Sequence, residues 1–400
     1  MTTRSRLALG YLTSQFPYGR AESFLEPEIQ ALADLGYAVH VVPVQCPGVP
    51  RPHAGSSTFA LGYRHVGVWA RFVGYALLHL PTMARLLRGL AHDKAHLVRN
   101  LAVLPLGVEV GRWAARSGLS HLHAHWLSTT ATAAWVAHEV SGIPYSITAH
   151  RWDIADGNLR ALKLRTASFV RCISESGKRS LAGDDAELGR IEVSHLGARL
   201  PSTEPGPAPT DTHPDTLVAV GNLIPVKGHR YLLEAMSLLI AQGLHVRLDI
   251  IGEGELLASL QERASALGIA DLVRFLGQLP HPEVESLLQT RQYLAMVMPS
   301  LDLGQGVHEG IPVSLMEAMS RGVPVIATTT GGIPELVADR ESGLLVPPAD
   351  AAALAGAIAR LRNDPELGPR LAGHAWTIVA ERFDIRECAA RLGRLIEDAA

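Results

Sequence analysis

Residues His308–Val337 read HEGIPVSLMEAMSRGVPVIATTTGGIPELV, and this stretch decides the fold of the second half of the chain. The segment Pro312–Ser320 has a helical pattern that opens with proline, a residue suited to the first position of a helix. The apolar run Val323–Thr328 predicts a buried strand, which a Gly-Gly turn follows. A helix that leads into a buried strand in this way indicates one repeat of a parallel α/β sheet.

Strands and helices alternate in the same way along the rest of the chain. The other strands expected in this half cover 216–223, 246–252, 273–277, 294–299 and 343–346. The first half has similar runs at 6–13, 37–44, 121–126, 145–150, 169–174 and 191–197. Apolar strands separated by helices form parallel sheets that helices cover on both faces. We therefore expect an α/β protein with two doubly wound, Rossmann-like parallel-sheet domains.

A proline-rich segment separates the two halves. Residues 201–215 contain five prolines among Ser, Thr, Gly and Asp residues, a composition typical of a stiff, extended linker. We expect one domain over 1–200 and a second over 216–382, with the amphipathic C-terminal residues 383–400 joining the first. Two such domains joined by one linker place a ligand cleft between the carboxyl ends of their sheets.

Two carboxylates and a helix start make the opening stretch a candidate ligand site. Glu309 lies in the loop before the expected helix, and Glu317 lies in its second turn. Free N–H groups at a helix start attract anions such as a diphosphate, and Gly310 lets a ligand approach the backbone closely. Ionised carboxylates accept hydrogen bonds from pairs of hydroxyl groups. The stretch therefore predicts a site for an extended ligand that carries both phosphate and hydroxyl groups.

Charge is distributed unevenly, although the whole chain carries a net charge of only −3. Residues 1–200 hold 21 Lys and Arg against 14 Asp and Glu, whereas residues 201–400 hold 15 against 25. Most of the basic excess falls in residues 61–117, where aromatic residues and leucines are interleaved with arginines. Such helices bind anionic lipid surfaces, but core-packing helices with solvated arginines have the same composition. The first interpretation predicts an anionic membrane surface as a partner.

Cysteine content and hydropathy limit the class of protein further. Three cysteines without a C-x-x-C spacing argue against a disulfide framework or a zinc ribbon. The N-terminal apolar run Leu7–Leu12 is too short for the core of a signal peptide, and no run reaches the roughly 18 apolar residues of a membrane span. We expect a cytoplasmic protein, peripheral on the inner face of the cell membrane through residues 61–117, with no nucleic acid partner.

Several motifs occur in the order found in one enzyme family. Residues 309–335 resemble the E-x7-E signature of retaining glycosyltransferases of family 4, which have the GT-B fold, and resemble most the exopolysaccharide enzymes of the colanic acid type. Further stretches that resemble this family are VGNLIPVKGHRYLLEA at Val220–Ala235, IGEGEL at Ile251–Leu256, FLGQL at Phe275–Leu279, YSITAHRWDI at Tyr145–Ile154 and FPYGRAESFLEPEI at Phe16–Ile29. The resemblance covers nearly the whole chain. It implies two domains that face an interdomain cleft.

The resemblance also implies an activity and roles for individual residues. By this resemblance, the protein would be an enzyme that moves a sugar from a nucleotide-diphosphate sugar to a saccharide or polyprenyl-diphosphate-linked acceptor in surface polysaccharide biosynthesis, without a cofactor or metal. Glu317 would hold the ribose, Glu309 the transferred sugar and Lys227 the diphosphate. The implied catalytic residues are His150, Lys227 and Glu309. The implied donor-binding residues are Gly221, Asn222, Lys227, Gly277, Gln278, Leu279, Glu309, Gly310, Ile311, Pro312, Val313 and Glu317.

Two positions depart from the family pattern. Where the family carries a phosphate-binding arginine in G-R-L, this chain has Gly221-Asn222-Leu223. Asn222 brings no charge, so Arg199 or Arg230 is a candidate substitute. The glycine-rich acceptor loop of the family is replaced by Pro17-Tyr18-Gly19-Arg20-Ala21-Glu22. We assign acceptor binding to Gly19, Arg20 and Glu22, with Arg20 facing a phosphate-bearing acceptor.

Other interpretations of the same residues stay open. The alternating His121, His123 and His125 could be read as metal ligands, although no Cys or Asp pattern completes a coordination shell. Glu309 and Glu317 could be the paired carboxylates of a glycoside hydrolase or phosphorylase, which must lie about 5–9 Å apart around one bond. A catalytically silent nucleotide-sugar-binding scaffold, suggested by Asn222, and a nucleotide-sugar 2-epimerase are further alternatives.

Overall fold

The computed structural model describes residues 7–19, 22–182, 189–206, 215–304 and 306–400. The chain forms two compact units, residues 1–195 with 386–400 (unit 1) and residues 196–385 (unit 2). The sequence-based boundaries were residues 200 and 383. Among the described residues, no helix is long and apolar enough to cross a membrane.

Unit 1 contains a seven-stranded sheet in the order β3-β2-β1-β4-β5-β6-β7, and every neighbouring pair is parallel. The strand order reverses between β1 and β4, which makes this edge of the sheet a topological switch point. The strands are β1 (Ala8–Thr13), β2 (Ala38–Pro43), β3 (Ser56–Thr58), β4 (His121–His125), β5 (Tyr145–Ala149), β6 (Val170–Cys172) and β7 (Ile191–Val193).

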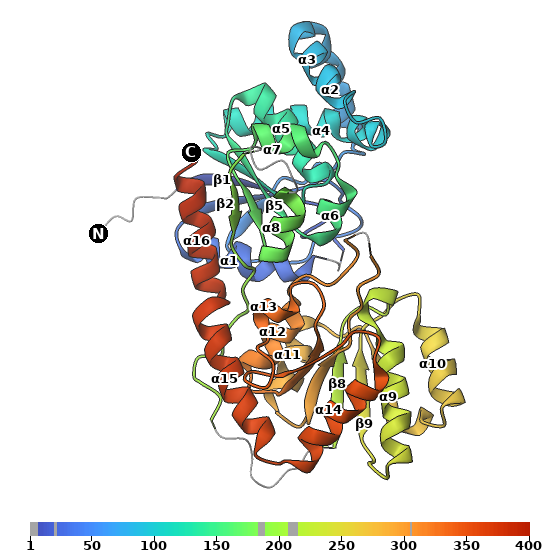
Figure 1. Cartoon of the computed structure of the whole chain (residues 1–400). Helices are drawn as coiled ribbons and strands as arrows, with labels where there is room; N and C mark the ends of the chain where they lie inside the picture. The colour runs from blue at the N-terminus through green and yellow to red at the C-terminus, as the bar shows by residue number, and fades with distance from the viewer. Residues whose placement is uncertain (1–6, 20–21, 183–188, 207–214, 305) are drawn as a thin grey trace. The chain divides into compact units, whose positions relative to one another are not determined.

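Helices cover both faces of this sheet (Figure 1). They are α1 (Glu26–Asp34), α2 (Val66–Leu78), α3 (Leu80–Leu90), α4 (Leu97–Arg116), α5 (Thr129–Ser141), α6 (Arg151–Asp156), α7 (Arg160–Thr166), α8 (Glu175–Ala182) and α16 (Ile385–Glu397), with a 3₁₀ turn η1 at Ser23–Leu25. The C-terminal helix α16, red in Figure 1, is tied to this unit by a hydrogen bond of 2.7 Å from the Tyr37 hydroxyl to Glu397.

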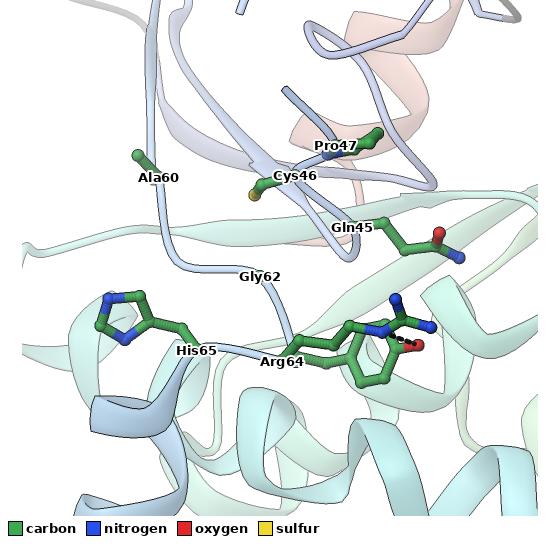
Figure 2. A pocket seen from close by; sticks show the side chains of 8 residues that line it. Gln45, Cys46, Pro47, Ala60, Gly62, Arg64 and His65 are labelled. Atoms are coloured by element: carbon green, nitrogen blue, oxygen red, sulfur yellow. Dashed lines mark hydrogen bonds between the residues drawn. The ribbon is translucent and has the colours of Figure 1, made fainter. Parts of the chain in front are cut away.

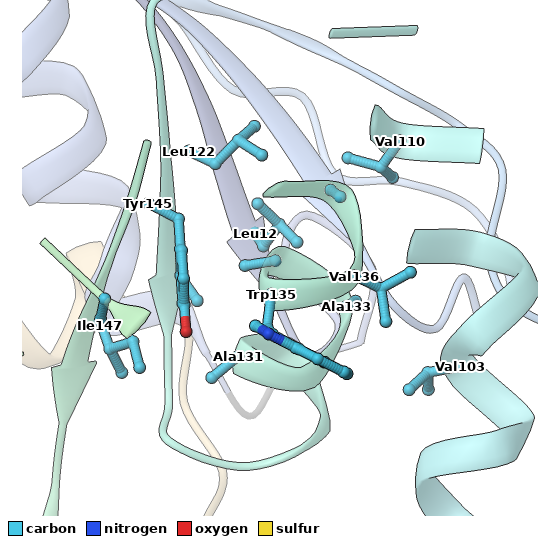
Figure 3. Close-up of a cluster of buried hydrophobic side chains, with 14 of the residues drawn as sticks. Leu12, Val103, Val110, Leu122, Ala131, Ala133, Trp135, Val136, Tyr145 and Ile147 are labelled. Carbon is cyan, nitrogen blue, oxygen red and sulfur yellow. The ribbon is translucent and has the colours of Figure 1, made fainter. Parts of the chain in front are cut away.

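The apolar core of unit 1 lies between one sheet face and the helices α4 and α5. Figure 3 shows Leu122 and Ile147 of the strands beside Trp135 of α5. The helices approach closely, because a Cβ on Gly107 of α4 would lie only 2.6 Å from Val136. Small residues at such a crossing let two backbones pack tightly. This core fixes the strands whose ends carry the candidate site.

Unit 2 contains a six-stranded parallel sheet in the order β10-β9-β8-β11-β12-β13. Its strands are β8 (Thr216–Val220), β9 (Arg247–Ile251), β10 (Val273–Gly277), β11 (Ala295–Met298), β12 (Val325–Thr328) and β13 (Leu344–Val346). Its helices are α9 (His229–Ala241), α10 (Leu257–Ala266), α11 (His281–Gln289), α12 (Val313–Ser320), α13 (Ile333–Leu336), α14 (Ala351–Asn363) and α15 (Leu367–Arg382), with 3₁₀ turns η2 (Pro225–Lys227) and η3 (Ala270–Leu272). Buried clusters lie on both sheet faces.

The predicted fold class, two doubly wound Rossmann-like parallel sheets, is confirmed. All the predicted strands occur, and their observed ends lie within four residues of the expected ends. The strand β3 was not predicted, because Ser56–Thr58 is three polar residues long and carries no apolar run. One detail of the opening stretch was wrong: Pro312 is the N-cap, with φ −71° and ψ 122°, and the helix begins at Val313.

Candidate active site

The residues predicted to bind the donor gather at the carboxyl edge of the unit 2 sheet. Its strand order reverses between β8 and β11, and the loops after these two strands carry Lys227 and Glu309. Ligands of open α/β sheets bind at such a reversal, because the two loops diverge there and leave space. Gly277 ends β10 at the same edge.

Lys227 and Glu309 form an ion pair, with 2.7 Å between Nζ and Oε2. Both side chains are largely buried, at 16% and 12% exposed, so water screens their attraction only partly. The Ser300 hydroxyl donates to the same Glu309 oxygen at 3.3 Å. The backbone oxygen of Ser300 in turn accepts from Thr328 and Thr330 at 2.6 and 3.1 Å. The ends of β11 and β12 therefore fix the carboxylate that the sequence predicted as catalytic.

A glycine turn holds the backbone of the Glu309 loop. Gly331 has φ +58°, and a Cβ there would lie 1.8 Å from the Glu309 carbonyl oxygen. The next residue, Gly332, donates its N–H to that oxygen at 3.3 Å. Gly331 therefore satisfies two demands that only glycine meets, a left-handed backbone and a close approach. This turn also supports the loop residues Gly310 and Ile311, because atoms of both lie next to Gly332.

Glu317 lies on α12, and its Oε1 contacts His281 Nε2 at 2.6 Å. The hydrogen bond to Glu317 raises the pKa of His281 above its ordinary value, against the effect of burial. Next to this pair, Arg321 donates to Glu285 and to the Glu317 backbone oxygen. Sequence analysis missed His281. The available signal was its place in Pro280-His281-Pro282, directly after the FLGQL stretch that was assigned to the donor.

Glu309 and Glu317 are each paired with a different partner. A hydrolase with two carboxylates around one bond would need them to face a common point. The Lys227 ammonium holds the first carboxylate, and the His281 imidazole holds the second. The arrangement suits a ligand with two polar ends better than the hydrolase alternative.

The remaining predicted donor residues line loops at the same edge. Gly221 leaves room for the Lys227 side chain, because a Cβ there would lie 3.3 Å from Lys227 Cε. Asn222 is exposed, and Gly277, with φ +67°, accepts the N–H of Gly252 at 2.8 Å. Gln278 and Leu279 follow Gly277, and Val313 opens α12.

The candidate cations that could replace the missing arginine lie apart from this pair. Arg230 interacts with Glu234 on its own helix at 3.6 Å and stacks over the Tyr231 ring. Arg199 is exposed. Among the residues that the structure describes, Lys227 is the cation in contact with Glu309.

In unit 1, His150 follows β5 and forms the N-cap of α6. Its Nε2 lies 2.6 Å from Nε2 of His125, and burial lowers the pKa of His150 to about 3. The Trp126 ring packs over the imidazole, with ring centroids 4.1 Å apart. Trp126 has φ +92°, a strained conformation for a bulky residue, as is common at functional sites. Sequence analysis did not single out Trp126 as a site residue.

A directional chain of hydrogen bonds lies behind His150. The Tyr11 hydroxyl donates to Glu28 at 2.6 Å, and Glu28 forms a fully buried ion pair with Arg171 at 2.7 Å. The Tyr11 oxygen is then free to accept from Nδ1–H of His125, which lies 2.9 Å away. His125 is left with Nε2 as an acceptor, so His150 donates through Nε2–H. The chain fixes the tautomer and orientation of a neutral His150.

The other two histidines of β4 contact hydroxyl groups. The His121 ring contacts Ser146 at 2.8 Å, and the His123 ring contacts Ser146 and Thr148 at 2.8 Å each. Both belong to a buried polar layer on one face of the sheet. Among the described residues, no group of three His, Cys, Asp or Glu side chains could hold a metal ion.

The predicted acceptor residues lie in the loop after β1. Glu22 is buried, and its carboxylate accepts the backbone N–H groups of Gln15 and Phe16 at 2.6 and 2.8 Å and the indole N–H of Trp126. Glu22 therefore shapes this loop and connects it to the residue that packs on His150. Gly19 has φ +63° in the same loop. Arg20 lies outside the described residues.

A cavity of about 260 Å³ lies beyond the carboxyl end of β2. Figure 2 shows Cys46 and Pro47 on one side and Gly62, Arg64 and His65 on the other. The Arg64 guanidinium lies over the Tyr63 ring and donates to its hydroxyl at 2.9 Å. Sequence analysis did not predict this cavity. Arg64 and His65 belong to the basic segment 61–117, but neither loop of the cavity carries a motif that indicates a pocket.

Comparisons with known proteins identify the class of enzyme. Residues 203–375 match the family model described as Glycosyl transferases group 1. The protein WcaL of Escherichia coli K12, a glycosyltransferase named for colanic acid biosynthesis, is 28% identical over 91% of this chain and 93% of its own. The amylovoran biosynthesis glycosyltransferase AmsK of Erwinia amylovora is 38% identical over 37% of this chain and 36% of its own.

A solved structure shares the fold of both units. HepE of Anabaena, in complex with UDP and glucose, has a TM-score of 0.70 at 18% identity and covers 98% of this chain and 100% of its own. The family model includes the loops of Lys227, Glu309 and Glu317. The chain is therefore a glycosyltransferase, and its two Rossmann-like parallel-sheet domains have the GT-B fold.

Proposed function

We propose that this enzyme is a retaining hexosyltransferase that moves a sugar from a nucleotide-diphosphate sugar to a polyprenyl-diphosphate-linked saccharide in surface polysaccharide biosynthesis. The observation that carries this proposal is the Lys227–Glu309 ion pair at the strand reversal of unit 2. The names of the colanic acid and amylovoran enzymes support the pathway class. The UDP in the HepE structure supports a nucleoside diphosphate donor.

The proposed chemistry needs positive charge at the leaving group. The bond from the anomeric carbon to the phosphate oxygen breaks, and its electron pair leaves with the diphosphate. Lys227 and the start of α12 would stabilise the developing negative charge. The acceptor oxygen attacks on the same face, and the departing phosphate takes its proton. No metal is required in this proposal, because the ammonium and the helix start supply the charge.

The proposed roles of the other residues follow from their contacts. Glu317 would accept the ribose hydroxyls, and His281 would hold its carboxylate in place. Glu309, with the N–H groups of Gly310 and Ile311, would orient the transferred sugar. The neutral His150 of unit 1 would contact the donor sugar with its ring, because its Nε2–H already donates to His125.

One experiment separates this proposal from its alternatives. The purified full chain is incubated with UDP- and GDP-sugars, with and without a polyprenyl-diphosphate-linked saccharide, and the products are analysed by NMR. The proposal expects a new glycoside with the anomeric configuration of the donor, formed only with acceptor. Turnover of donor to an epimer without acceptor would indicate the epimerase. Binding of nucleotide sugar without any transfer or hydrolysis would indicate the silent scaffold, and an inverted product would contradict retention.

A further inference from the structure

The helix α2 exposes an apolar stripe instead of burying it. Val66, Trp69, Ala70, Val73 and Leu77 recur at positions i, i+3, i+4, i+7 and i+11, so they share one face of the helix. All five are exposed, and Val66 and Leu77 are 81% and 71% exposed. The opposite face is also apolar and packs on the core of unit 1. A helix that is apolar on all sides is normally buried, so the outer face lacks its partner.

The exposed stripe continues into α3. Leu78 is 81% exposed and Leu80 is 65% exposed, whereas Met83, Leu86 and Leu90 anchor α3 in the core. Within unit 1, α2 and α3 project beyond α4 and α5 (Figure 1). We call the outer surface the apolar ridge and define it by Val66, Trp69, Val73, Leu77, Leu78 and Leu80. Nine of the thirteen exposed large apolar side chains among the described residues fall in residues 66–101.

The charges around the apolar ridge are positive. Arg64 lies just before α2 and Arg88 lies near the end of α3, and both are exposed. The acidic Glu109 is only 7% exposed and is paired with Arg71 at 2.9 Å. The other acidic residue of this region, Asp93, contacts His96 at 2.7 Å. The exposed charges beside the ridge are therefore those of arginines.

We propose that the apolar ridge inserts into the surface of an anionic lipid bilayer, with Arg64 and Arg88 at the level of the headgroups. An apolar helix face flanked by cations is the combination that binds such surfaces. A second copy of the chain fits less well, because a two-fold contact would place like charges against each other. The reason for binding a membrane rests on the proposed function, because a lipid-linked acceptor lies at a membrane surface.

The ridge begins where the cavity of unit 1 ends. Arg64 and His65 line that cavity (Figure 2), and Val66 is the first residue of both α2 and the ridge. A molecule with a phosphate at the bilayer surface would meet Arg64 first. This continuity places a recess lined in part by Arg64 and His65 directly beside the inserted face.

The test uses the full chain and sedimentation with vesicles of phosphatidylglycerol or of phosphatidylcholine. The wild type is expected to bind the anionic vesicles and to bind the zwitterionic vesicles at least tenfold more weakly. Leu77→Gln with Leu78→Gln, and separately Arg64→Glu with Arg88→Glu, should each lower binding to anionic vesicles at least tenfold. These side chains are exposed, so the variants keep their core. Matched controls are Leu238→Gln on α9 and Arg370→Glu on α15, which should bind like the wild type.

Fluorescence locates the contact on the ridge. Vesicles should shift the emission of the wild type to the blue, and Trp69→Phe should lose most of this shift. The proposal is overturned if anionic vesicles do not bind, if both double variants bind normally, or if Trp69→Phe shifts like the wild type. It is also overturned if the ridge variants abolish a dimer while vesicles do not bind, which would make the ridge a contact between copies.

The vesicle-binding result can be judged separately from the proposed sugar transfer. The ridge variants should bind UDP or GDP in calorimetry as tightly as the wild type. Loss of vesicle binding with intact nucleotide binding supports the ridge. Intact vesicle binding in a chain that transfers no sugar would contradict the proposed function and leave the ridge supported.

Discussion

Gly331 shows how one residue without a side chain positions the Glu309 loop. Its backbone is left-handed and touches the Glu309 carbonyl, so a methyl group would collide at 1.8 Å. We expect Gly331→Ala to displace Glu309 and weaken binding of the nucleotide sugar at least tenfold, since displacements of about 1 Å cost about a hundredfold in activity. Calorimetry with UDP- and GDP-sugars, which carry the sugar that Glu309 is proposed to hold, measures the effect.

A matched glycine provides the control for this prediction. Gly268 has a similar φ of +69°, but a Cβ there would meet no atom within 4 Å. Gly268→Ala should strain the backbone without moving the site. If both variants bind the nucleotide sugar equally, the contact with Glu309 is not what Gly331 provides.

The His281–Glu317 pair gives a prediction about protonation. The hydrogen bond to Glu317 raises the pKa of His281 above 6.5, whereas burial alone would lower it. The stability from this pair is therefore present below about pH 6.5 and is lost as pH rises through the raised pKa. NMR titration should find the His281 pKa above 6.5 in the wild type and clearly lower in Glu317→Gln. Glu285→Gln removes only a carboxylate 4.0 Å away and should lower it less; an equal fall in both variants would contradict the pairing.

At the scale of elements, the histidines of β4 and His150 after β5 are buried and make the fold sensitive to acid. Burial lowers the pKa of His121 and His150 to about 3, and burial also lowers the pKa of His123 and His125 well below 6.5. Unfolding lets these rings take up protons, so stability is lost as pH falls below about 6.5. Each ring contributes about 1.4 kcal/mol per pH unit to the unfolding free energy.

Urea unfolding between pH 7.5 and pH 5 measures this loss. Removing one ring by His121→Gln should reduce the pH dependence by about one proton, whereas His245→Gln, at an exposed position, should leave it unchanged. A pH dependence that is the same in His121→Gln and the wild type would show that β4 does not carry the effect.

The same elements show what the sequence could predict. The apolar runs predicted all the strands except β3, because burial on both faces leaves a continuous pattern while Ser56–Thr58 has none. The loops of Lys227, Glu309 and Glu317 could be placed at one sheet edge, because the carboxyl ends of parallel strands meet there. The partners Ser300 and Tyr11 could not be predicted, because they join the site only through tertiary contacts, whereas the place of His281 directly after the FLGQL stretch was a signal that sequence analysis did not use.

The orientation of α2 was also beyond the sequence. Its two faces are both apolar, so periodicity alone could not tell which one meets the core. Burial of the Phe72 and Tyr75 side turns the Val66, Val73 and Leu77 side outward. The structure also pairs Arg71 with Glu109 and Arg85 with Glu139. Substitution of Arg71 or Arg85 would therefore break an ion pair as well as remove a charge, so Arg64 and Arg88 are the better positions for testing attraction to anionic headgroups.

At the scale of the whole molecule, the charge is distributed unevenly between the two halves of the chain. The basic excess of the first half surrounds the apolar ridge of unit 1, and the acidic second half carries a local cation, Lys227, at its strand reversal. A nucleotide site needs only a few local cations, so the net acidity of that half is compatible with a diphosphate. The sequence predicted this division because the strand pattern and the proline-rich linker are local features.

Sugar transfer by Lys227 and Glu317 variants tests the central claim most directly. Release of nucleoside diphosphate in the presence of a polyprenyl-diphosphate-linked acceptor is measured for the wild type, Lys227→Ala, Lys227→Arg and Glu317→Ala. We expect Lys227→Ala and Glu317→Ala to lose at least a hundredfold in kcat/KM, about 2.7 kcal/mol of transition-state stabilisation. Lys227→Arg should keep part of the activity because it keeps the charge. Turnover of Lys227→Ala at the wild-type rate would contradict the account.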